Sequence, residues 1–333
     1  MKNKWANAHL FCFLKIVLYI CDKIIKVQNK MIKVQNEIID VKRFPDGTQM
    51  LLDFDASVLY RPAPIKIVWC YESDDEALTL MYLKRHIDNN YFPIMFPSQK
   101  ANVELIMPYL PNARMDRVKS DAEIFTLKHF CWFINSLCFD KVHIMDPHST
   151  VSEALINNVR VLKPYLIIDD AINKMRSLND FEADKQCINL VRELVIYFPD
   201  DGAYKRYKDA PCFENLNCIY GKKERDWETG KILGIEIYDK NGSKLTNELE
   251  NCDVLMVDDI ISYGGTLAYS ADKLKEMGAA HISAYATHVE NSILDEEKGT
   301  LLKRYNDKII DTVYTTNSIY HGNHPMVEVI HKF

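Results

Sequence analysis

The stretch Asp253-Val-Leu-Met-Val-Asp-Asp-Ile-Ile-Ser-Tyr-Gly-Gly-Thr266 combines a short apolar run, two acids and a double-glycine turn. The run 254–257 is brief and contains β-branched residues, which predicts a buried strand. Apolar residues then recur at helical spacing over 267–277, and Gly278 follows them as a stop signal. The stretch therefore predicts the strand-turn-helix unit from which α/β sheets are built.

The turn in this stretch has the chemistry of a phosphate site. In open α/β sheets, ligands bind beyond the carboxyl ends of the strands, where helix N-termini point. The turn Ser262, Tyr263, Gly264, Gly265 and Thr266 would offer backbone N–H groups and the positive end of a helix dipole. We expect a phosphate there; an ordinary strand-turn-helix is the alternative.

Two adjacent acids precede the turn. These acids, Asp258 and Asp259, cannot both serve the same phosphate, because carboxylates and phosphate are all negatively charged. They suit sugar hydroxyls or a hydrated Mg²⁺ beside the phosphate, whereas surface acids are the alternative interpretation. The stretch as a whole predicts a sugar-phosphate site.

Composition limits the classes of protein that are possible. The chain has 333 residues, 47% of them hydrophobic and 26% charged, which suggests two globular domains. A formal net charge of −6 argues against a nucleic-acid binder, because phosphate backbones demand a basic face. Nine cysteines without a Cys-x-x-Cys pair predict reduced thiols, and we expect a cytoplasmic protein.

The first thirty residues differ from the rest. Residues 5–21 are largely apolar after a basic start, but Lys15 lies among them and no clear cleavage site follows. The sequence Ile-Lys-Val-Gln-Asn occurs at 25–29 and again at 32–36. We interpret residues 1–30 as an extension outside the fold. A membrane or export signal is the rival interpretation, and we consider membrane association unlikely.

Strands and helices alternate along the remaining chain, which predicts parallel βαβ units. The predicted domains are 31–165 and 166–317, followed by a C-terminal tail at 318–333. The first is expected to contain strands at 38–44, 50–54, 66–70, 103–107 and 141–145 and helices at 74–86 and 122–137. The second is expected to contain a helix at 181–193 and strands at 166–168, 194–198, 218–220, 232–238, 254–257, 281–287 and 312–315.

Four further polar segments lie at the carboxyl ends of predicted strands. They are Arg43-Phe-Pro-Asp-Gly47, Met107-Pro-Tyr-Leu-Pro-Asn-Ala-Arg-Met-Asp-Arg117, Met145-Asp-Pro-His148 and Pro199-Asp-Asp-Gly202. Arg114 and Arg117 could grip phosphate oxygens, although a solvated charged loop would look the same. His148 at a strand end could touch metal or phosphate, and Asp200 could orient a metal-bound water or a ribose hydroxyl.

The segment 221–231 is polar and bounded by glycines, so it predicts a mobile hairpin or lid. A solvated hairpin tip is the alternative. Within it, Lys223 and Arg225 have the spacing of a Lys-x-Arg pair, and Lys222 is a competing alignment.

Together these motifs resemble the ribose-phosphate pyrophosphokinase family over residues 31–317. The resemblance implies two phosphoribosyltransferase-like α/β domains, each with a mainly parallel sheet flanked by helices, the first serving ATP and the second ribose 5-phosphate. It implies transfer of the diphosphate of MgATP to the 1-hydroxyl of ribose 5-phosphate, giving phosphoribosyl pyrophosphate and AMP. Mg²⁺ as cofactor, ATP as co-substrate and a homo-oligomer (dimer or hexamer) are also implied.

The resemblance assigns a role to each matching residue. Lys223, Arg225 and His148 are expected to act in catalysis, with His148 and Asp200 near the metal. The residues expected to bind ATP are Phe44, Asp46, Arg114, Asp116 and Arg117. The residues expected to bind ribose 5-phosphate are Asp258, Asp259, Ser262, Tyr263, Gly264, Gly265 and Thr266.

Three positions depart from the family pattern. Ser262 stands where a third aspartate is usual, Met115 replaces a glutamine, and Thr48 replaces a glutamate. Two alternatives therefore stay open: a phosphoribosyltransferase acting on a nucleobase or nicotinamide, and a non-catalytic regulatory homologue. The chain has no Gly-x-x-x-x-Gly-Lys-Ser/Thr, which argues against a Walker-type kinase, and no Gly-x-Gly-x-x-Gly, so dinucleotide binding has no support.

Overall fold

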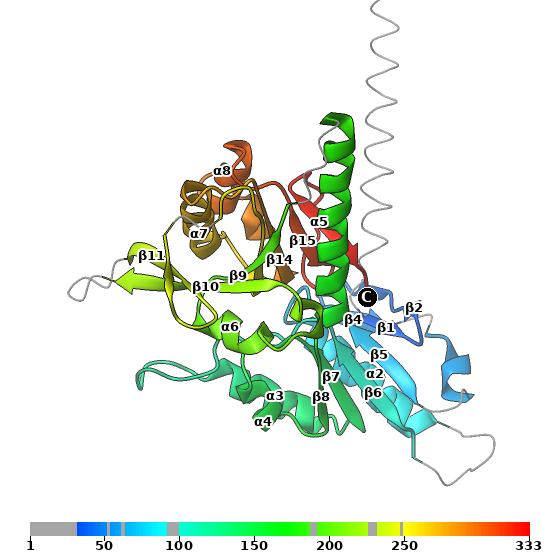
Figure 1. Ribbon diagram of the computed structural model, residues 1–333. Helices are drawn as coiled ribbons and strands as arrows, with labels where there is room; N and C mark the ends of the chain where they lie inside the picture. Colours follow the sequence, from blue (N-terminus) through cyan, green and yellow to red (C-terminus); the bar gives the residue numbers. More distant parts are fainter. Residues whose placement is uncertain are drawn as a thin grey trace, which may run out of the picture. The chain divides into compact units, whose positions relative to one another are not determined.

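The computed structural model describes residues 32–51, 54–60, 64–91, 100–186, 192–225, 232–246 and 249–333 (Figure 1). The expected extension at 1–30 lies outside these residues. The chain forms two compact units. The first comprises the described residues up to Met107 together with Phe133–Val142, and the second comprises Pro108–Trp132 with His143–Phe333. The domain boundaries drawn from the sequence stay a prediction.

The first unit is built on a small mixed sheet. Strand β1 pairs antiparallel with β2 and β5, and β5 pairs parallel with β6. The predicted hairpin is present but shorter than expected, as the pair β3 and β4. The elements are β1 (Ile32–Val34), β2 (Glu37–Ile38), β3 (Val41–Arg43), β4 (Gln49–Leu51), η1 (Ala56–Tyr60), β5 (Ile65–Trp69), α2 (Glu76–Asn90) and β6 (Val103–Met107). Helix α3 (Thr126–Ser136) and strand β7 (Lys141–Met145) each contain a unit boundary.

The second unit contains an eight-stranded sheet of order β12-β11-β10-β9-β13-β14-β15-β16. Pairing is parallel from β10 through β16 and antiparallel at β10–β11 and β11–β12. Its strands are β9 (Leu194–Phe198), β10 (Asn217–Arg225), β11 (Ile232–Asp239), β12 (Lys244–Leu245), β13 (Asp253–Ile261), β14 (His281–Val289), β15 (Val313–Thr316) and β16 (Val327–His331). The predicted mainly parallel sheet is confirmed.

Helices cover both faces of this sheet (Figure 1). They are α5 (Tyr165–Gln186), α6 (Asp201–Tyr207), α7 (Gly265–Glu276) and α8 (Thr300–Asn306), and the unit also holds α4 (Val151–Leu155), β8 (Val159–Leu162), η2 (Pro211–Phe213) and η3 (Asn291–Leu294). No helix among the described residues is both long and apolar enough to cross a membrane.

Strand β13 is the centre of the second unit because both of its faces are buried. Val254 and Met256 belong to the core beneath α7 and α8. Leu255 and Val257 belong to the core beneath α5 and α6. Successive side chains of a strand point to opposite faces, so an apolar run at these positions places β13 in the middle layer of a three-layer α/β unit.

One sequence expectation about an element is wrong, and two others stop short of the observed structure. The expected strand at 166–168 is the first turn of α5, whose core residues Ile168, Ala171, Ile172 and Met175 recur at helical spacing. A short apolar run does not distinguish a strand from a buried helix, and Pro164 suits a helix start. The strand expected at 254–257 extends to Ile261, so both acids lie within β13. Strand β16, within the segment expected to be a tail, pairs with β15.

Candidate active site

The turn between β13 and α7 is shaped by Gly264. This residue precedes the first turn of α7 with φ of +80°, a left-handed conformation that glycine adopts without steric cost. The carbonyl oxygen of Tyr263 accepts hydrogen bonds from Thr300 N (3.0 Å), Leu301 N (3.3 Å) and Thr300 Oγ1 (2.9 Å) at the start of α8. Within the described chain, the N–H groups of Gly265 and Thr266 have no acceptor, as is usual in the first turn of a helix. The turn therefore has donors to offer to an anion.

Substituting Gly264 with alanine should both strain and crowd the turn. An added Cβ would lie 2.5 Å from Leu301 Cβ, in a conformation that L-residues disfavour. We expect the free energy of unfolding to fall by about 2–4 kcal/mol, measured by denaturant unfolding. Gly265→Ala is the matched control, because its Cβ would meet nothing closer than 4.0 Å. Equal stability of the two variants would contradict the assigned turn conformation.

Asp259 joins three parts of the second unit. It is 4% exposed. Its Oδ2 lies 2.8 Å from His148 Nδ1 and 2.9 Å from Arg206 Nη1. Arg206, on α6, also donates from Nη2 to the backbone oxygen of His148. Asp259 and Arg206 therefore fix both the ring and the backbone of His148.

The two adjacent acids of β13 have different proton affinities. Burial alone would raise the pKa of Asp259, but His148 and Arg206 hold it well below its ordinary value. Burial raises the pKa of Asp258 well above its ordinary value. The negative charge of Asp259 raises it further, and that of Asp200 adds a weaker effect. Neighbouring carboxyls with divided pKa values commonly have different roles. Asp259 is the ionised partner of His148 and Arg206, whereas Asp258 Oδ1 accepts a hydrogen bond from Asp259 N at 2.9 Å.

Asp146, directly after β7, forms a second buried cluster. Its Oδ2 accepts hydrogen bonds from Tyr207 Oη and Thr287 Oγ1, each at 2.5 Å. His288 Nε2 lies 3.3 Å from the Asp146 backbone oxygen, and His288 Nδ1 lies 2.9 Å from Ser318 Oγ. Burial, reinforced by Asp259, raises the pKa of Asp146 to about 6. This cluster holds the segment that carries His148 against β14.

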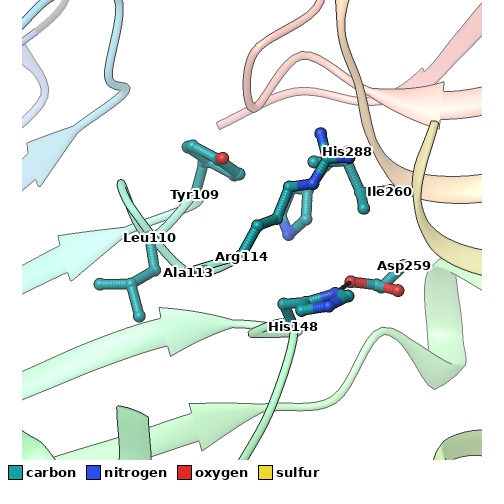
Figure 2. A pocket seen from close by; sticks show the side chains of 8 residues that line it. All are labelled: Tyr109, Leu110, Ala113, Arg114, His148, Asp259, Ile260 and His288. Carbon is teal, nitrogen blue, oxygen red and sulfur yellow. Dashed lines mark hydrogen bonds and ion pairs between the residues drawn. The ribbon is translucent and has the colours of Figure 1, made fainter. Parts of the chain in front are cut away.

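A shallow pocket opens at this edge of the sheet, with about 210 Å³ of empty space including its mouth. Figure 2 shows His148 reaching toward Asp259, with Arg114 and His288 among the other residues that line the pocket. The ring of Tyr109 meets His288 edge-on at a centroid distance of 5.1 Å. The lining residues, all in the second unit, are Tyr109, Leu110, Ala113, Arg114, His148, Asp259, Ile260 and His288.

Arg114 contacts the turn directly. Its Nη1 donates to Ser262 Oγ at 2.9 Å and lies 3.1 Å from Glu290 Oε1. The structure therefore brings together Arg114 and His148, both expected on the ATP side, with Asp259 and Ser262, both expected on the ribose 5-phosphate side.

His288 should make the fold sensitive to acid. Burial lowers its pKa to about 4, compared with about 6.5 in an unfolded chain. Between these values the unfolded chain binds a proton that the folded chain does not, so stability falls as the pH drops from 6.5 to 4, by up to about 3 kcal/mol. We expect His288→Gln to lessen this loss in unfolding measurements across that range. The exposed His129→Gln is the control. An unchanged pH profile for His288→Gln would contradict the assignment.

Other predicted residues have structural partners of their own. The exposed Arg117 donates from Nε to Asp116 Oδ1 at 3.0 Å. Burial would raise the pKa of Asp116, but hydrogen bonds from Arg117 and Ser149 hold it below its ordinary value. Asp200 Oδ1 caps α6 by accepting from Gly202 N and Ala203 N, at 3.0 and 3.1 Å. Its expected metal role stays a prediction.

Phe44 and Asp46 lie in the first unit, at the β3–β4 turn. Phe44 is exposed. Asp46 Oδ1 accepts from Thr48 N at 2.9 Å and Thr48 Oγ1 at 2.7 Å, which lowers the pKa of Asp46. Thr48, which replaces the usual glutamate, therefore shapes this turn. Contact of Phe44 and Asp46 with adenine stays a prediction.

The segment expected to be a lid begins as part of β10. Residues 226–231 and the side chains of Lys223 and Arg225 lie outside the described parts of the protein. Lys222 is described: its Nζ lies 4.5 Å from the Tyr238 ring centroid and 5.5 Å from that of Tyr220. Cation–π contacts of this kind engage the ammonium group. Lys222, the competing candidate for the Lys-x-Arg pair, therefore already has a structural role in contact with these two rings.

The residues present fit a Mg²⁺ that arrives with a nucleotide better than a resident metal. No group of three or more His, Cys, Asp or Glu side chains among the described residues is placed to hold a metal ion. Mg²⁺ usually keeps several waters and takes one or two carboxylates together with substrate phosphates. Asp258 at the strand end suits such a shared site.

Three site residues were missed by the sequence reasoning. Arg206 looked like an ordinary base in the last turn of a helix, where cations are favoured. His288 lies just beyond the strand predicted at 281–287, and Glu290 follows the end of β14. Both residues lie near the carboxyl end of a predicted strand, and this position could have identified them as site candidates.

Comparison with known proteins places the chain among named relatives. No family model matches it. It is 26% identical over 255 residues to a ribose-phosphate pyrophosphokinase of Pyrococcus abyssi, covering 75% of each chain. It is 26% identical over 291 residues to a ribose-phosphate pyrophosphokinase of Vibrio cholerae, covering 84% of this chain and 78% of the relative.

A solved structure shares the fold. The phosphoribosylpyrophosphate synthetase of Mycobacterium smegmatis aligns with a TM-score of 0.64 and 16% identity. The alignment covers 88% of this chain and 85% of that one. The expected α/β fold, with sheets flanked by helices, is thereby confirmed.

Proposed function

We propose that the chain is a divergent member of the ribose-phosphate pyrophosphokinase family and that it makes phosphoribosyl pyrophosphate. The proposed reaction transfers the diphosphate of MgATP to the 1-hydroxyl of ribose 5-phosphate and releases AMP. One observation carries the proposal: Arg114 meets Ser262, and His148 meets Asp259. Residues assigned to the nucleotide and to the sugar phosphate thus meet at the end of one strand.

The sugar phosphate is proposed to occupy the turn after β13. The free N–H groups of Gly265 and Thr266, at the start of α7, would bind the 5-phosphate. Asp258, with its raised pKa, would accept a hydrogen bond from a ribose hydroxyl or share one through a water. Asp259 stays engaged with His148 and Arg206, so its part is to orient His148.

The nucleotide is proposed to approach from the side of Arg114 and His148. Phosphoryl transfer depends on positioning and charge neutralisation more than on a covalent nucleophile. A guanidinium and an imidazole already fixed in place lose little freedom when they bind phosphate oxygens. Mg²⁺, when bound with ATP, neutralises phosphate charge. Lys223 and Arg225 would add positive charge at the transferring phosphates.

The two alternatives predict different requirements. A phosphoribosyltransferase would need the turn and the acids but not Arg114 and His148, whose joint attachment to β13 favours the kinase. A non-catalytic homologue would bind substrates without turnover. Incubating the purified protein with Mg²⁺, ATP and ribose 5-phosphate, and separately with Mg²⁺, phosphoribosyl pyrophosphate and a nucleobase, separates all three. We expect AMP to form only when ribose 5-phosphate is present and without need of a base.

We further propose that the protein acts as a homo-oligomer in the cytoplasm. The family resemblance supports a dimer or hexamer. Sedimentation of the purified protein at several concentrations tests this: a mass of 38.7 kDa at every concentration would identify a monomer and contradict the proposal.

A further inference from the structure

One nitrogen of Arg114 carries two contacts. Nη1 donates to Ser262 Oγ at 2.9 Å and lies 3.1 Å from Glu290 Oε1. Ser262 belongs to the turn proposed to bind phosphate, and Glu290 directly follows β14. The Arg114 and Glu290 side chains are 53% and 33% exposed, so the pair remains open to a ligand.

Glu290 is itself held firmly beside the turn. Its backbone N–H donates to Ile261 O at 2.8 Å, one residue before Ser262. Its Oε2 accepts a hydrogen bond from Ser292 Oγ at 3.1 Å. Both the backbone and the carboxylate of Glu290 are therefore fixed relative to the end of β13, and Glu290 can fix the guanidinium in turn.

The N–H donors of Arg114 other than those on Nη1 remain available to a ligand. A guanidinium has five N–H donors in a rigid plane. Among the described residues, none accepts a hydrogen bond from Nε or Nη2 of Arg114. Holding Nη1 from one side orients the edge formed by Nε and Nη2, which has the geometry for two phosphate oxygens.

An acid at a site for anions is otherwise unfavourable. Glu290 would repel an approaching phosphate if it were unpaired. Paired with Nη1, it uses one edge of Arg114 and leaves the other for a ligand. We propose that Glu290 is a positioning residue, which holds Arg114 in the orientation that binds the polyphosphate of the nucleotide. Naming a nucleotide rests on the proposed function.

The test measures nucleotide binding without turnover. Calorimetry with Mg²⁺ and α,β-methylene-ATP, in which the bond to be cleaved is replaced, compares wild type with Glu290→Gln. Exposed ion pairs contribute up to about 1 kcal/mol, and a misplaced guanidinium adds to that loss, so we expect affinity to fall about 3–10-fold. Glu296→Gln removes the same charge from an exposed position in the same loop and should leave affinity unchanged.

A second variant separates positioning from general structure. Ser262→Asp places a carboxylate at the other contact of Nη1, so Ser262→Asp/Glu290→Gln should recover most of the lost affinity. In turnover assays, Glu290→Gln should raise KM for ATP by the same factor and change kcat less than about twofold. An unchanged affinity for Glu290→Gln, or no recovery in the double variant, would overturn the positioning role alone. A wild type that binds no nucleotide would overturn the proposed function as well.

Discussion

Replacing Lys223 with alanine is expected to lower kcat by about 10²–10³-fold with little change in KM for either substrate. This corresponds to the 2.7–4 kcal/mol that a preorganised donor typically supplies to a transition state. The contacts of its neighbour favour Lys223 as the catalytic lysine, because the Lys222 ammonium already engages the rings of Tyr220 and Tyr238.

Lys222→Ala is the control for this experiment. The Lys222 ammonium lies over the rings of Tyr220 and Tyr238, and Tyr220 belongs to the core beneath α5 and α6. Its loss should cost about 0.5–1 kcal/mol of stability and leave kcat nearly unchanged. Steady-state kinetics of both variants decide the matter. If Lys222→Ala is the inactive variant, the assignment of the Lys-x-Arg pair is wrong by one residue.

Replacing Asp259 with asparagine is expected to lower the free energy of unfolding by about 3–5 kcal/mol, because it leaves the largely enclosed Arg206 without its ion-pair partner. It also removes the ionised partner that orients His148, so turnover should be lost. Chemical denaturation measures the first effect, and the AMP assay at a temperature where the variant stays folded measures the second.

Asp258→Asn is the matched comparison at the neighbouring position. Its raised pKa means that the fold already disfavours the ionised form, so a neutral amide should change stability by less than about 1 kcal/mol. Turnover should still fall, because the amide keeps a carbonyl acceptor but cannot become the carboxylate that would hold a ribose hydroxyl more strongly. Equal destabilisation by the two substitutions would contradict the division of roles between the acids.

The elements with strong local signals were predictable from the sequence. The 254–257 run, the double-glycine turn and the helix ending before Gly278 were found because apolar periodicity and glycine act within a few residues. The same reasoning failed at 166–168, in the first turn of α5, because three apolar residues fit either a strand or a helix that packs against the sheet.

The partners within the site were less predictable. The role of Arg206 depends on contact with Asp259 and with the backbone of His148, each more than fifty residues away. The pairing of Arg114 with Glu290 spans 176 residues. Such contacts are created by the order of strands in the sheet, and no local pattern in one sequence encodes them. The residue types were visible, but their pairing required the fold.

The most direct test of the account is the product of its proposed reaction. Phosphorus NMR should follow the assembled wild-type protein with Mg²⁺, ATP and ribose 5-phosphate. We predict that ATP is consumed only when ribose 5-phosphate is present, and that AMP and a diphosphate ester of the sugar appear in equal amounts. ADP in place of AMP, or no consumption of ATP by a folded sample, would contradict the account.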